Sequence, residues 1–281
     1  MEKIYKFLLT KTIGGYINIL SYVAPEKAFK LAYKFFSNPR LGKLIPENLP
    51  KFLQDSQLEI LQKKDFSIQT YLWKGDSTVI LLAHGWESNS ARWEKLLPNL
   101  IQTGHTIVAL DAPAHGLSSG KEFNVPLYAS FIEVVIQKHQ PKHIIGHSMG
   151  GIAAIYYQHK FTNHNLEKMV LLGSPSDFSI ILENYLKLLS LNHKIRVAFH
   201  KYILDRFQIN IDDFSGKYFL KTSQLKGMIV HDTEDTVVQI IEAQKMASSW
   251  KSVQLITTSG FGHSLRDESI NEKIIAFLVE A

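Results

Sequence analysis

The sequence contains no cysteine, which excludes disulfide bonds and thiolate metal sites. This absence is typical of a reducing compartment, and we expect a cytoplasmic location. No apolar run is long enough to cross a bilayer, because the stretch 13–24 is short and includes Asn18 and Ser21. Near the start, the apolar run Phe7-Leu8-Leu9 ends at Thr10, and no small-residue cleavage site follows it. We therefore expect no secretory signal.

A broad basic surface is also missing. Residues 1–51 hold nine Lys or Arg and three Asp or Glu, whereas the rest of the chain holds 22 and 23. The net charge of +5 thus belongs to the N-terminal segment. Because no basic patch interleaved with aromatic residues occurs elsewhere, we expect no nucleic-acid partner.

The N-terminal segment 1–45 has a helical pattern. Between Lys27 and Phe36, apolar residues recur at helical spacing, and Lys27, Lys30 and Lys34 line the opposite side. Two interpretations are open. The helix packs on its own domain with its lysines in solvent, or it makes peripheral contact with an anionic membrane surface. Residues 46–64, with Pro46 and Pro50, are expected to form a linker and a short helical or irregular piece.

From residue 65 onward, apolar strand patterns alternate with amphipathic helix patterns. Strands are expected at 66–73, 78–82, 106–110, 143–145, 168–172, 227–230 and 253–256. Helices are expected at 90–102, 125–138, 149–159, 237–248 and 268–279. This alternation predicts an α/β fold with a mostly parallel sheet flanked by helices.

One block interrupts the alternation. Residues 174–224 contain two helical patterns, 177–190 and 193–207, between two expected strands. Since ligands of open parallel sheets bind beyond the carboxyl ends of the strands, we expect this insertion to form a small helical cap over the site. The expected organisation is an N-terminal helical extension at 1–64, a core at 65–173 and 225–281, and a cap at 174–224.

The stretch 143–151 carries the strongest chemical signal. An apolar strand pattern runs into Gly146-His147-Ser148-Met149-Gly150, and a helix pattern follows at once. This arrangement is that of a nucleophile elbow, a sharp strand–turn–helix that exposes a serine hydroxyl. The pentapeptide alone occurs often by chance, so its context has to supply a base, an acid and oxyanion donors.

Each of these partners has a candidate after an expected strand. His263 follows the last strand and is the candidate base, whereas His147 adjoins the serine and is unlikely to face it. Asp235 is the favoured acid because it precedes a helix whose amides can fix its carboxylate. Asp232 and Glu234 lie in the same loop and stay open as alternatives, and Asp177 is a further one.

Backbone amides are expected to bind the oxyanion, since a tetrahedral intermediate requires fixed dipoles. The amide of Met149 follows the nucleophile, and the amide of Trp86 lies after the strand at 78–82. We expect Gly85, His147, Phe178 and Ile181 to line the substrate pocket.

Together these motifs identify the chain as similar to the α/β-hydrolase superfamily, in its small-cap serine esterase and lipase branch. The matching pieces span residues 66–281 and are His84-Gly85-Trp86, the Asp111–Ser118 loop, Gly146–Gly151, Asp235 with Val237-Val238, and Gly262-His263. The resemblance implies an eight-stranded sheet, a Ser148–His263–Asp235 triad, and neither a cofactor nor a metal. It also implies a structural role for Asp111.

Two positions depart from that family's pattern. Relatives commonly carry glycine where Ala114 stands, and glycine where Asp232 stands. The second departure places an extra carboxylate close to Asp235 and leaves the acid assignment open.

The expected activity is hydrolysis of a small-molecule carboxylic ester or lipid ester through an acyl-enzyme, in the EC 3.1.1 class. Because the cap pattern is rich in Ile and Leu, we expect it to suit an acyl chain. Thioester, carbon–carbon bond, amide or peptide hydrolysis with the same triad are alternatives. A non-catalytic binding module with a hydrolase fold is another, since fold does not guarantee activity.

Overall fold

The computed structural model describes residues 2–280. By internal contacts the chain divides into two units, one of Met1–Asn38 with Asp177–Ser215 and the other of Pro39–Ser176 with Gly216–Ala281. The N-terminal helices and the inserted helices therefore belong to one unit. The sequence pattern indicates two separate segments, an N-terminal extension and a cap. The second unit contains the whole sheet.

The second unit is built on an eight-stranded sheet in the order β1-β2-β4-β3-β5-β6-β7-β8. Its strands, in chain order, are Gln57–Lys63, Phe66–Trp73, Val79–Ala83, Thr106–Leu110, His143–His147, Lys168–Leu172, Lys226–Asp232 and Val253–Thr258. The pairs β1–β2 and β2–β4 are antiparallel, and the pairs from β4 to β8 are parallel. The expected α/β class with a mostly parallel sheet is confirmed.

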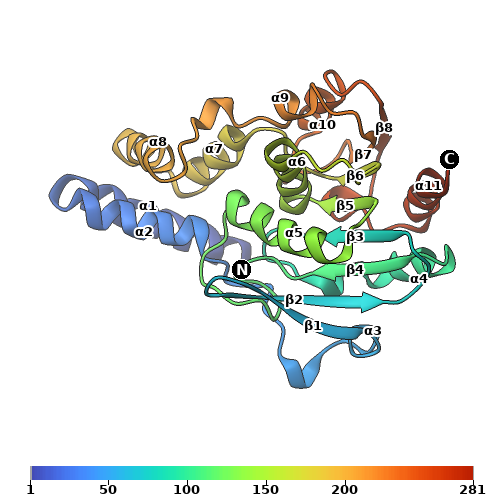
Figure 1. Cartoon of the computed structure of the whole chain (residues 1–281). Coiled ribbons are helices and arrows are strands. Elements are labelled where there is room, and N and C mark those ends of the chain that lie inside the picture. Colours follow the sequence, from blue (N-terminus) through green and yellow to red (C-terminus); the bar gives the residue numbers. More distant parts are fainter. Residues whose placement is uncertain (1, 281) are drawn as a thin grey trace. The chain divides into compact units, whose positions relative to one another are not determined.

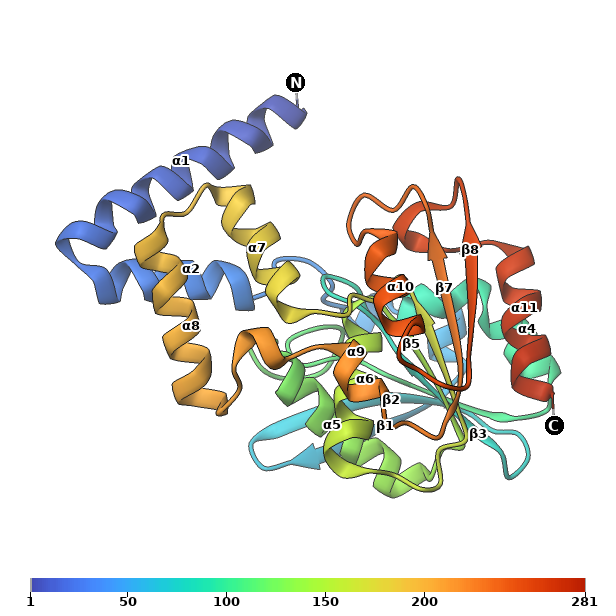
Figure 2. The same ribbon diagram turned by 90° about the horizontal axis from the view of Figure 1, so that it is seen from above.

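Helices cover both faces of this sheet (Figures 1 and 2). One face carries α5 (Val125–His139), α6 (Met149–Phe161), α9 (Gly216–Leu220) and α10 (Ile240–Ala247). The other carries α3 (Lys51–Gln54), α4 (Leu97–Gln102) and α11 (Glu268–Val279), together with the 3-10 helix Ser90–Lys95. Alternate residues of β3 and β4, such as Ile80 and Ile107, pack against this second set. Each fully buried aliphatic side chain there contributes roughly 1.5–3 kcal/mol.

Strand β1 was not expected from the local pattern, which indicated a linker and a short helical or irregular piece at 46–64. It forms a hairpin with β2 in which Lys63 pairs with Phe66, so the turn consists of Lys64 and Asp65. Tight hairpin turns usually signal themselves by Asn-Gly or Asp-Gly, and here Lys64 adopts a positive φ of 50° without such a signal. As an edge strand, β1 also exposes Leu58 and Ile60, which blurs the alternation.

Ala114 adopts the left-handed backbone conformation, at a position where proteins of the resembling family commonly carry glycine. Its φ is 65°, and its amide donates to Ser119 O at 3.0 Å. In this conformation a residue with a Cβ is destabilised by about 1–2 kcal/mol relative to glycine. Glycine, however, loses more backbone entropy on folding, which costs about 0.5–1 kcal/mol and offsets part of that difference. We therefore expect Ala114→Gly to raise the free energy of unfolding by roughly 0.5–1 kcal/mol, measured by urea denaturation. An unchanged or lower midpoint would show that this turn is not strained.

The first unit is helical. It contains α1 (Glu2–Val23), α2 (Pro25–Ser37), α7 (Phe178–Leu189), α8 (His193–Phe207) and the 3-10 helix Ile211–Asp213. Its core holds Ile17 of α1, Ala28 and Ala32 of α2, Leu182 and Leu186 of α7, and Ile195 and Phe199 of α8. The lysines of α2 at positions 27, 30 and 34 are exposed. The N-terminal helices thus pack on the inserted ones and leave a lysine face in solvent.

Candidate active site

Ser148 lies on the turn between β5 and α6, with a positive φ of 52° and ψ of −121°. Its amide donates to Leu172 O of the neighbouring strand at 2.8 Å. The glycines of the motif are required by close packing, because a Cβ on Gly146 would lie 2.5 Å from Gly151 Cα and one on Gly150 would lie 2.2 Å from Ala83 O. Strained turns of this kind concentrate at functional sites, where they present one side chain in a fixed direction.

His263 and Asp235 form a hydrogen-bonded pair. His263 Nδ1 lies 2.7 Å from Asp235 Oδ2, and the other carboxylate oxygen accepts from the amides of Val237 (2.8 Å) and Val238 (2.9 Å). Burial acts to raise the pKa of Asp235, but the hydrogen bonds from His263 and the two amides outweigh it and lower that pKa. An ionised Asp235 accepts the Nδ1 proton, so the Nε2 atom of His263 is left as the basic nitrogen.

Several contacts bring this pair to the same corner as Ser148. His147 Nε2 lies 2.9 Å from His263 O, and the two rings are 4.9 Å apart. A Cβ on Gly173, which follows the strand residue bound to the Ser148 amide, would lie 3.3 Å from His263 Nδ1 and 3.5 Å from Asp235 Oδ2. Within residues 2–280 no hydrogen bond joins the Ser148 hydroxyl to the His263 ring. Such bonds often tighten only in the substrate complex.

Asp232 has different partners from Asp235. Its carboxylate is fully buried and accepts from the Phe261 amide at 3.0 Å, the Thr258 hydroxyl at 2.8 Å and the Glu234 amide at 2.9 Å. Burial raises the pKa of Asp232, but these bonds outweigh it and lower that pKa. Asp232 thus ties down the loop that carries His263.

The other two acids considered from the sequence also have different partners. Glu234 is exposed and accepts from the Ser259 hydroxyl. Asp177 belongs to the helical unit, where it precedes α7 and accepts from the Ser215 hydroxyl. Among the four carboxylates, Asp235 is the one that the His263 ring contacts.

Substitution by asparagine separates the roles of the two buried acids. We expect Asp235→Asn to lower kcat by roughly 10³–10⁴, because an amide no longer selects the imidazole tautomer. Asp232→Asn should change kcat less than tenfold and lower the free energy of unfolding by about 1.5–3 kcal/mol, through weaker bonds to the His263 loop. Ester hydrolysis and urea denaturation of both variants measure these effects. A larger loss of kcat in Asp232→Asn than in Asp235→Asn would reverse the acid assignment.

The two expected oxyanion donors lie beside the nucleophile. Met149 is the first residue of α6, and Gly85 approaches so closely that a Cβ on it would lie 2.9 Å from Ser148 Cβ. In the described part of the chain, neither the Met149 amide nor the Trp86 amide donates to a protein acceptor. Both amides therefore lack a protein acceptor in the described residues, and their role as oxyanion donors stays a prediction.

Two buried histidines hold the loop that carries Trp86. His84 Nε2 accepts from the Ala112 amide at 2.9 Å, so its Nδ1 donates to Gly85 O at 2.8 Å. His115 Nε2 accepts from the Glu87 amide at 2.9 Å. Burial lowers the pKa of His84 to about 4 and that of His115 to about 3. Both rings are therefore neutral near pH 7 and hold the Gly85–Trp86 peptide in place. From the sequence, His84 was identified only as part of the His84-Gly85-Trp86 motif, without this role.

Asp111 is a buried anchor for the neighbouring loop. Its carboxylate accepts from the Ser90 amide and hydroxyl, the Leu117 amide and the Tyr71 hydroxyl, at 2.8–2.9 Å. These bonds occupy both oxygens, which fits the structural role implied by the resemblance.

Arg92 supports the His263 loop and was not noticed in the sequence, where nothing distinguishes it from a surface arginine. It is buried, its guanidinium donates to Ser264 O at 3.0 Å, and burial lowers its pKa to about 9. Burial and the nearby Arg92 charge also hold the pKa of His147 well below its ordinary value. A neutral His147 donates to His263 O, so it is a support for the loop and not a base.

Of the four expected pocket residues, Gly85 and His147 lie directly at Ser148. Phe178 and Ile181 are the first and fourth residues of α7 in the helical unit. Their place in a substrate pocket stays a prediction.

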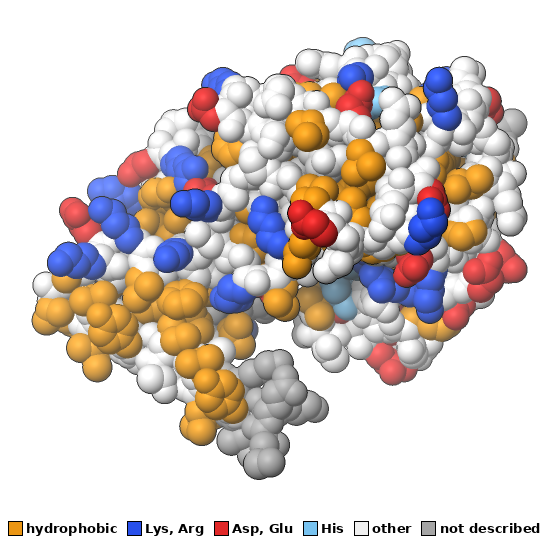
Figure 3. Space-filling model, turned by 90° about the horizontal axis from the view of Figure 1, so that it is seen from below, with side chains coloured by type: hydrophobic (Ala, Val, Ile, Leu, Met, Phe, Trp, Pro, Cys, Tyr) orange, Lys and Arg blue, Asp and Glu red, His pale blue; other side chains and the backbone are white. Residues whose placement is uncertain are grey.

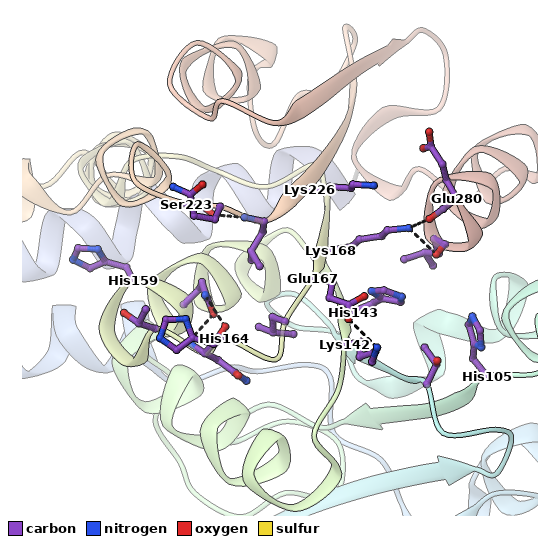
Figure 4. A pocket seen from close by; sticks show the side chains of 18 of the residues that line it. His105, Lys142, His143, His159, His164, Glu167, Lys168, Ser223, Lys226 and Glu280 are labelled. Carbon is purple, nitrogen blue, oxygen red and sulfur yellow. Dashed lines mark hydrogen bonds and ion pairs between the residues drawn. The ribbon is translucent and has the colours of Figure 1, made fainter.

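A cavity of about 890 Å³ opens elsewhere, at the amino ends of the parallel strands (Figure 4). Its cations are engaged within the protein: Lys142 pairs with Glu167 at 2.8 Å, and Lys168 donates to the carbonyls of Phe277 and Leu278 at 3.0 Å. Ser148 and His263 follow the carboxyl ends of the strands, so this cavity is separate from the candidate site. Among the described residues, no cluster of three or more His, Asp or Glu is arranged to hold a metal ion.

Comparison with known proteins agrees with this geometry. A family model described as the alpha/beta hydrolase fold matches residues 78–195. A serine hydrolase-like protein of Danio rerio is 41% identical over 81 residues, covering 27% of this chain and 24% of its own length. A bifunctional esterase/perhydrolase of Acinetobacter calcoaceticus is 25% identical over 260 residues, covering 72% of this chain and 92% of its own.

A solved hydrolase from Thermoplasma acidophilum, described as CIB-like, shares the fold. Its TM-score is 0.59 at 19% identity, over 79% of this chain and 97% of that one. With the sheet order and the elbow, these matches show that the chain has the α/β-hydrolase fold, and they support the α/β-hydrolase superfamily as its family.

Proposed function

We propose that the protein is a serine hydrolase that cleaves a carboxylic ester through an acyl-enzyme, with Ser148 as nucleophile, His263 as base and Asp235 as orienting acid. The observation that carries this proposal is the 2.7 Å bond between Asp235 and His263, next to a serine on a strained strand–helix turn. The fold and the relatives named as hydrolases support hydrolysis as the reaction class, and the ester and the triad are the finer part of the proposal.

The reaction proceeds in two halves. His263 Nε2 takes the proton of the Ser148 hydroxyl as its oxygen attacks the ester carbonyl, and the resulting oxyanion accepts bonds from the Trp86 and Met149 amides. Collapse of the intermediate breaks the bond to the alcohol, which receives its proton from His263. Water then attacks the acyl-enzyme in the same manner and releases the acid. No cofactor or metal takes part in this scheme.

An ester is the favoured substrate class for two reasons. The Acinetobacter relative, which aligns over most of its length, is named an esterase. Of the residues that we propose for the acyl pocket, Gly85, His147, Phe178 and Ile181, the last two have apolar side chains that suit an acyl chain. The absence of cysteine favours a cytoplasmic location for this activity.

A substrate panel tests the proposal. Purified protein is assayed with p-nitrophenyl esters of increasing acyl length, with acyl-CoA thioesters and with matched p-nitroanilides, each beside a Ser148→Ala control. We expect the highest kcat/KM on an ester and none above background in the control. A higher kcat/KM on thioesters or anilides would replace the ester assignment while keeping the triad. Equal rates in the control would remove the triad and favour a binding module.

A further inference from the structure

Helix α1 is fixed along one side to the other helices of its unit. Gly14 lies so close to the end of α7 that a Cβ on it would be 1.7 Å from Leu189 O. Asn18 donates to Ser190 O and accepts from the Asn192 amide, both at 2.8 Å. Lys11 donates to Leu188 O at 3.0 Å. The helix is therefore held in one rotational setting, and its opposite side is a fixed outward face.

That outward face is apolar. The large hydrophobic side chains exposed on α1 are Tyr5, Phe7, Leu8, Leu9, Tyr16, Ile19, Tyr22 and Val23. Five of these, Tyr5, Leu8, Tyr16, Ile19 and Val23, recur at helical spacing and share one side of the helix, with the exposed Thr12 between Leu8 and Tyr16. A helix with apolar side chains on both its packed side and its outward side is normally buried on both sides by protein or lipid. Patches of this extent usually mark an interaction surface.

Among the described side chains of α1, none on this face is charged. Lys11 is charged but lies toward α7, where it donates to Leu188 O. Lys194 of α8 lies 4.0 Å from the ring of Tyr22 at one end of the face. The unit as a whole holds eleven Lys or Arg and seven Asp or Glu. Figure 3 shows the hydrophobic side chains of this unit gathered together, with Lys and Arg side chains along one border.

We propose that the outward face of α1 docks the protein onto an anionic lipid surface. Apolar side chains mixed with tyrosine rings, in a unit with an excess of lysine and arginine, are the composition of helices that lie in the bilayer interface. Each lysine near such a surface adds roughly fivefold to the affinity. No described helix is long and apolar enough to span a bilayer. This inference does not depend on the proposed hydrolysis.

A flotation experiment tests the docking. The full chain carries Ser148→Ala so that no lipid is consumed, and it is mixed with vesicles of phosphatidylcholine containing phosphatidylglycerol. We expect it to float with these vesicles, and less in high salt or with phosphatidylcholine alone. Adding Ile19→Gln and Val23→Gln should lower the fraction that floats. Measured over a series of lipid concentrations, the apparent affinity should fall at least tenfold. These side chains are 71% and 75% exposed, so the fold should persist, as circular dichroism will check.

A matched control changes two exposed apolar residues of the sheet unit, Ile60→Gln and Tyr218→Gln, and should float like the parent. As a second readout, Ile19→Trp should show a blue-shifted emission when anionic vesicles are added. Equal flotation of the α1 variant and the control, or no shift of that tryptophan, would overturn the proposal. So would a dimer, seen by light scattering, that the α1 variant dissociates while the parent fails to float.

Discussion

Replacing Ser148 by alanine should lower kcat for ester hydrolysis by a factor on the order of 10⁶, and His263→Ala should cost about as much. The expectation follows from the way the two groups act as a unit. Without the hydroxyl there is no acyl-enzyme, and without the imidazole the hydroxyl keeps its proton. The remaining rate comes from the Trp86 and Met149 amides acting on bound substrate and water.

Non-additivity provides the sharper form of this prediction. If both residues serve one step, the double variant Ser148→Ala/His263→Ala should be no slower than either single variant, within about threefold. Steady-state assays on the best substrate of the panel measure all three. Losses that multiply in the double variant would show that the two side chains act in separate steps, and a small loss in either single variant would remove it from the mechanism.

Mild acid should destabilise the protein strongly, between about pH 6 and pH 4. His84 and His115 each use one ring nitrogen to accept an amide proton, so protonation breaks a buried hydrogen bond. In the unfolded chain both titrate near pH 6.5, but in the folded state burial keeps their pKa values at about 4 and about 3. The unfolded state therefore binds more protons in this range. Each histidine lowers the free energy of unfolding by about 1.4 kcal/mol per pH unit.

For both residues the expected slope is about 3 kcal/mol per pH unit, against a total stability of roughly 5–15 kcal/mol. Urea denaturation at pH 7.5, 6, 5 and 4.5 measures it. As a control, His115→Gln retains an acceptor for the Glu87 amide without a titrating group and should reduce the slope by about 1.4 kcal/mol per pH unit. The carboxylates of Asp232 and Asp235 have lowered pKa values, so their contribution is lost only at lower pH. A flat stability between pH 7.5 and 5 would contradict this account.

Much of the fold could be predicted because its signals are local. Buried parallel strands such as β3 and β6 contain continuous apolar runs, and α8 and α11 begin and end where their patterns do. Strand β1 escaped because Lys64 forms its turn without a glycine. The packing of α1 and α2 on α7 and α8 escaped as well, since a shared core around Ile17 and Phe199 leaves no trace in either segment alone.

The candidate site divides in the same way. Gly-x-Ser-x-Gly and its chain order with Asp235 and His263 are sequence features, so the candidates could be named in advance. What separates Asp235 from Asp232 is geometry, because Asp232 ends β7, Asp235 lies three residues further on, and both are buried. Only the direction of each carboxylate, one to an imidazole and one to the Phe261 amide, distinguishes them. Arg92 and His84 act through backbone carbonyls, for which no sequence motif exists.

The most direct test of the central claim is covalent labelling by a fluorophosphonate. Such a reagent bonds to an activated serine oxygen with loss of fluoride, and it needs no knowledge of the natural substrate. We predict one adduct per chain, mapped by mass spectrometry to the peptide containing Ser148, and none in Ser148→Ala or after acid unfolding. An adduct on another serine, or none on the native protein, would contradict the assignment of Ser148 as the nucleophile.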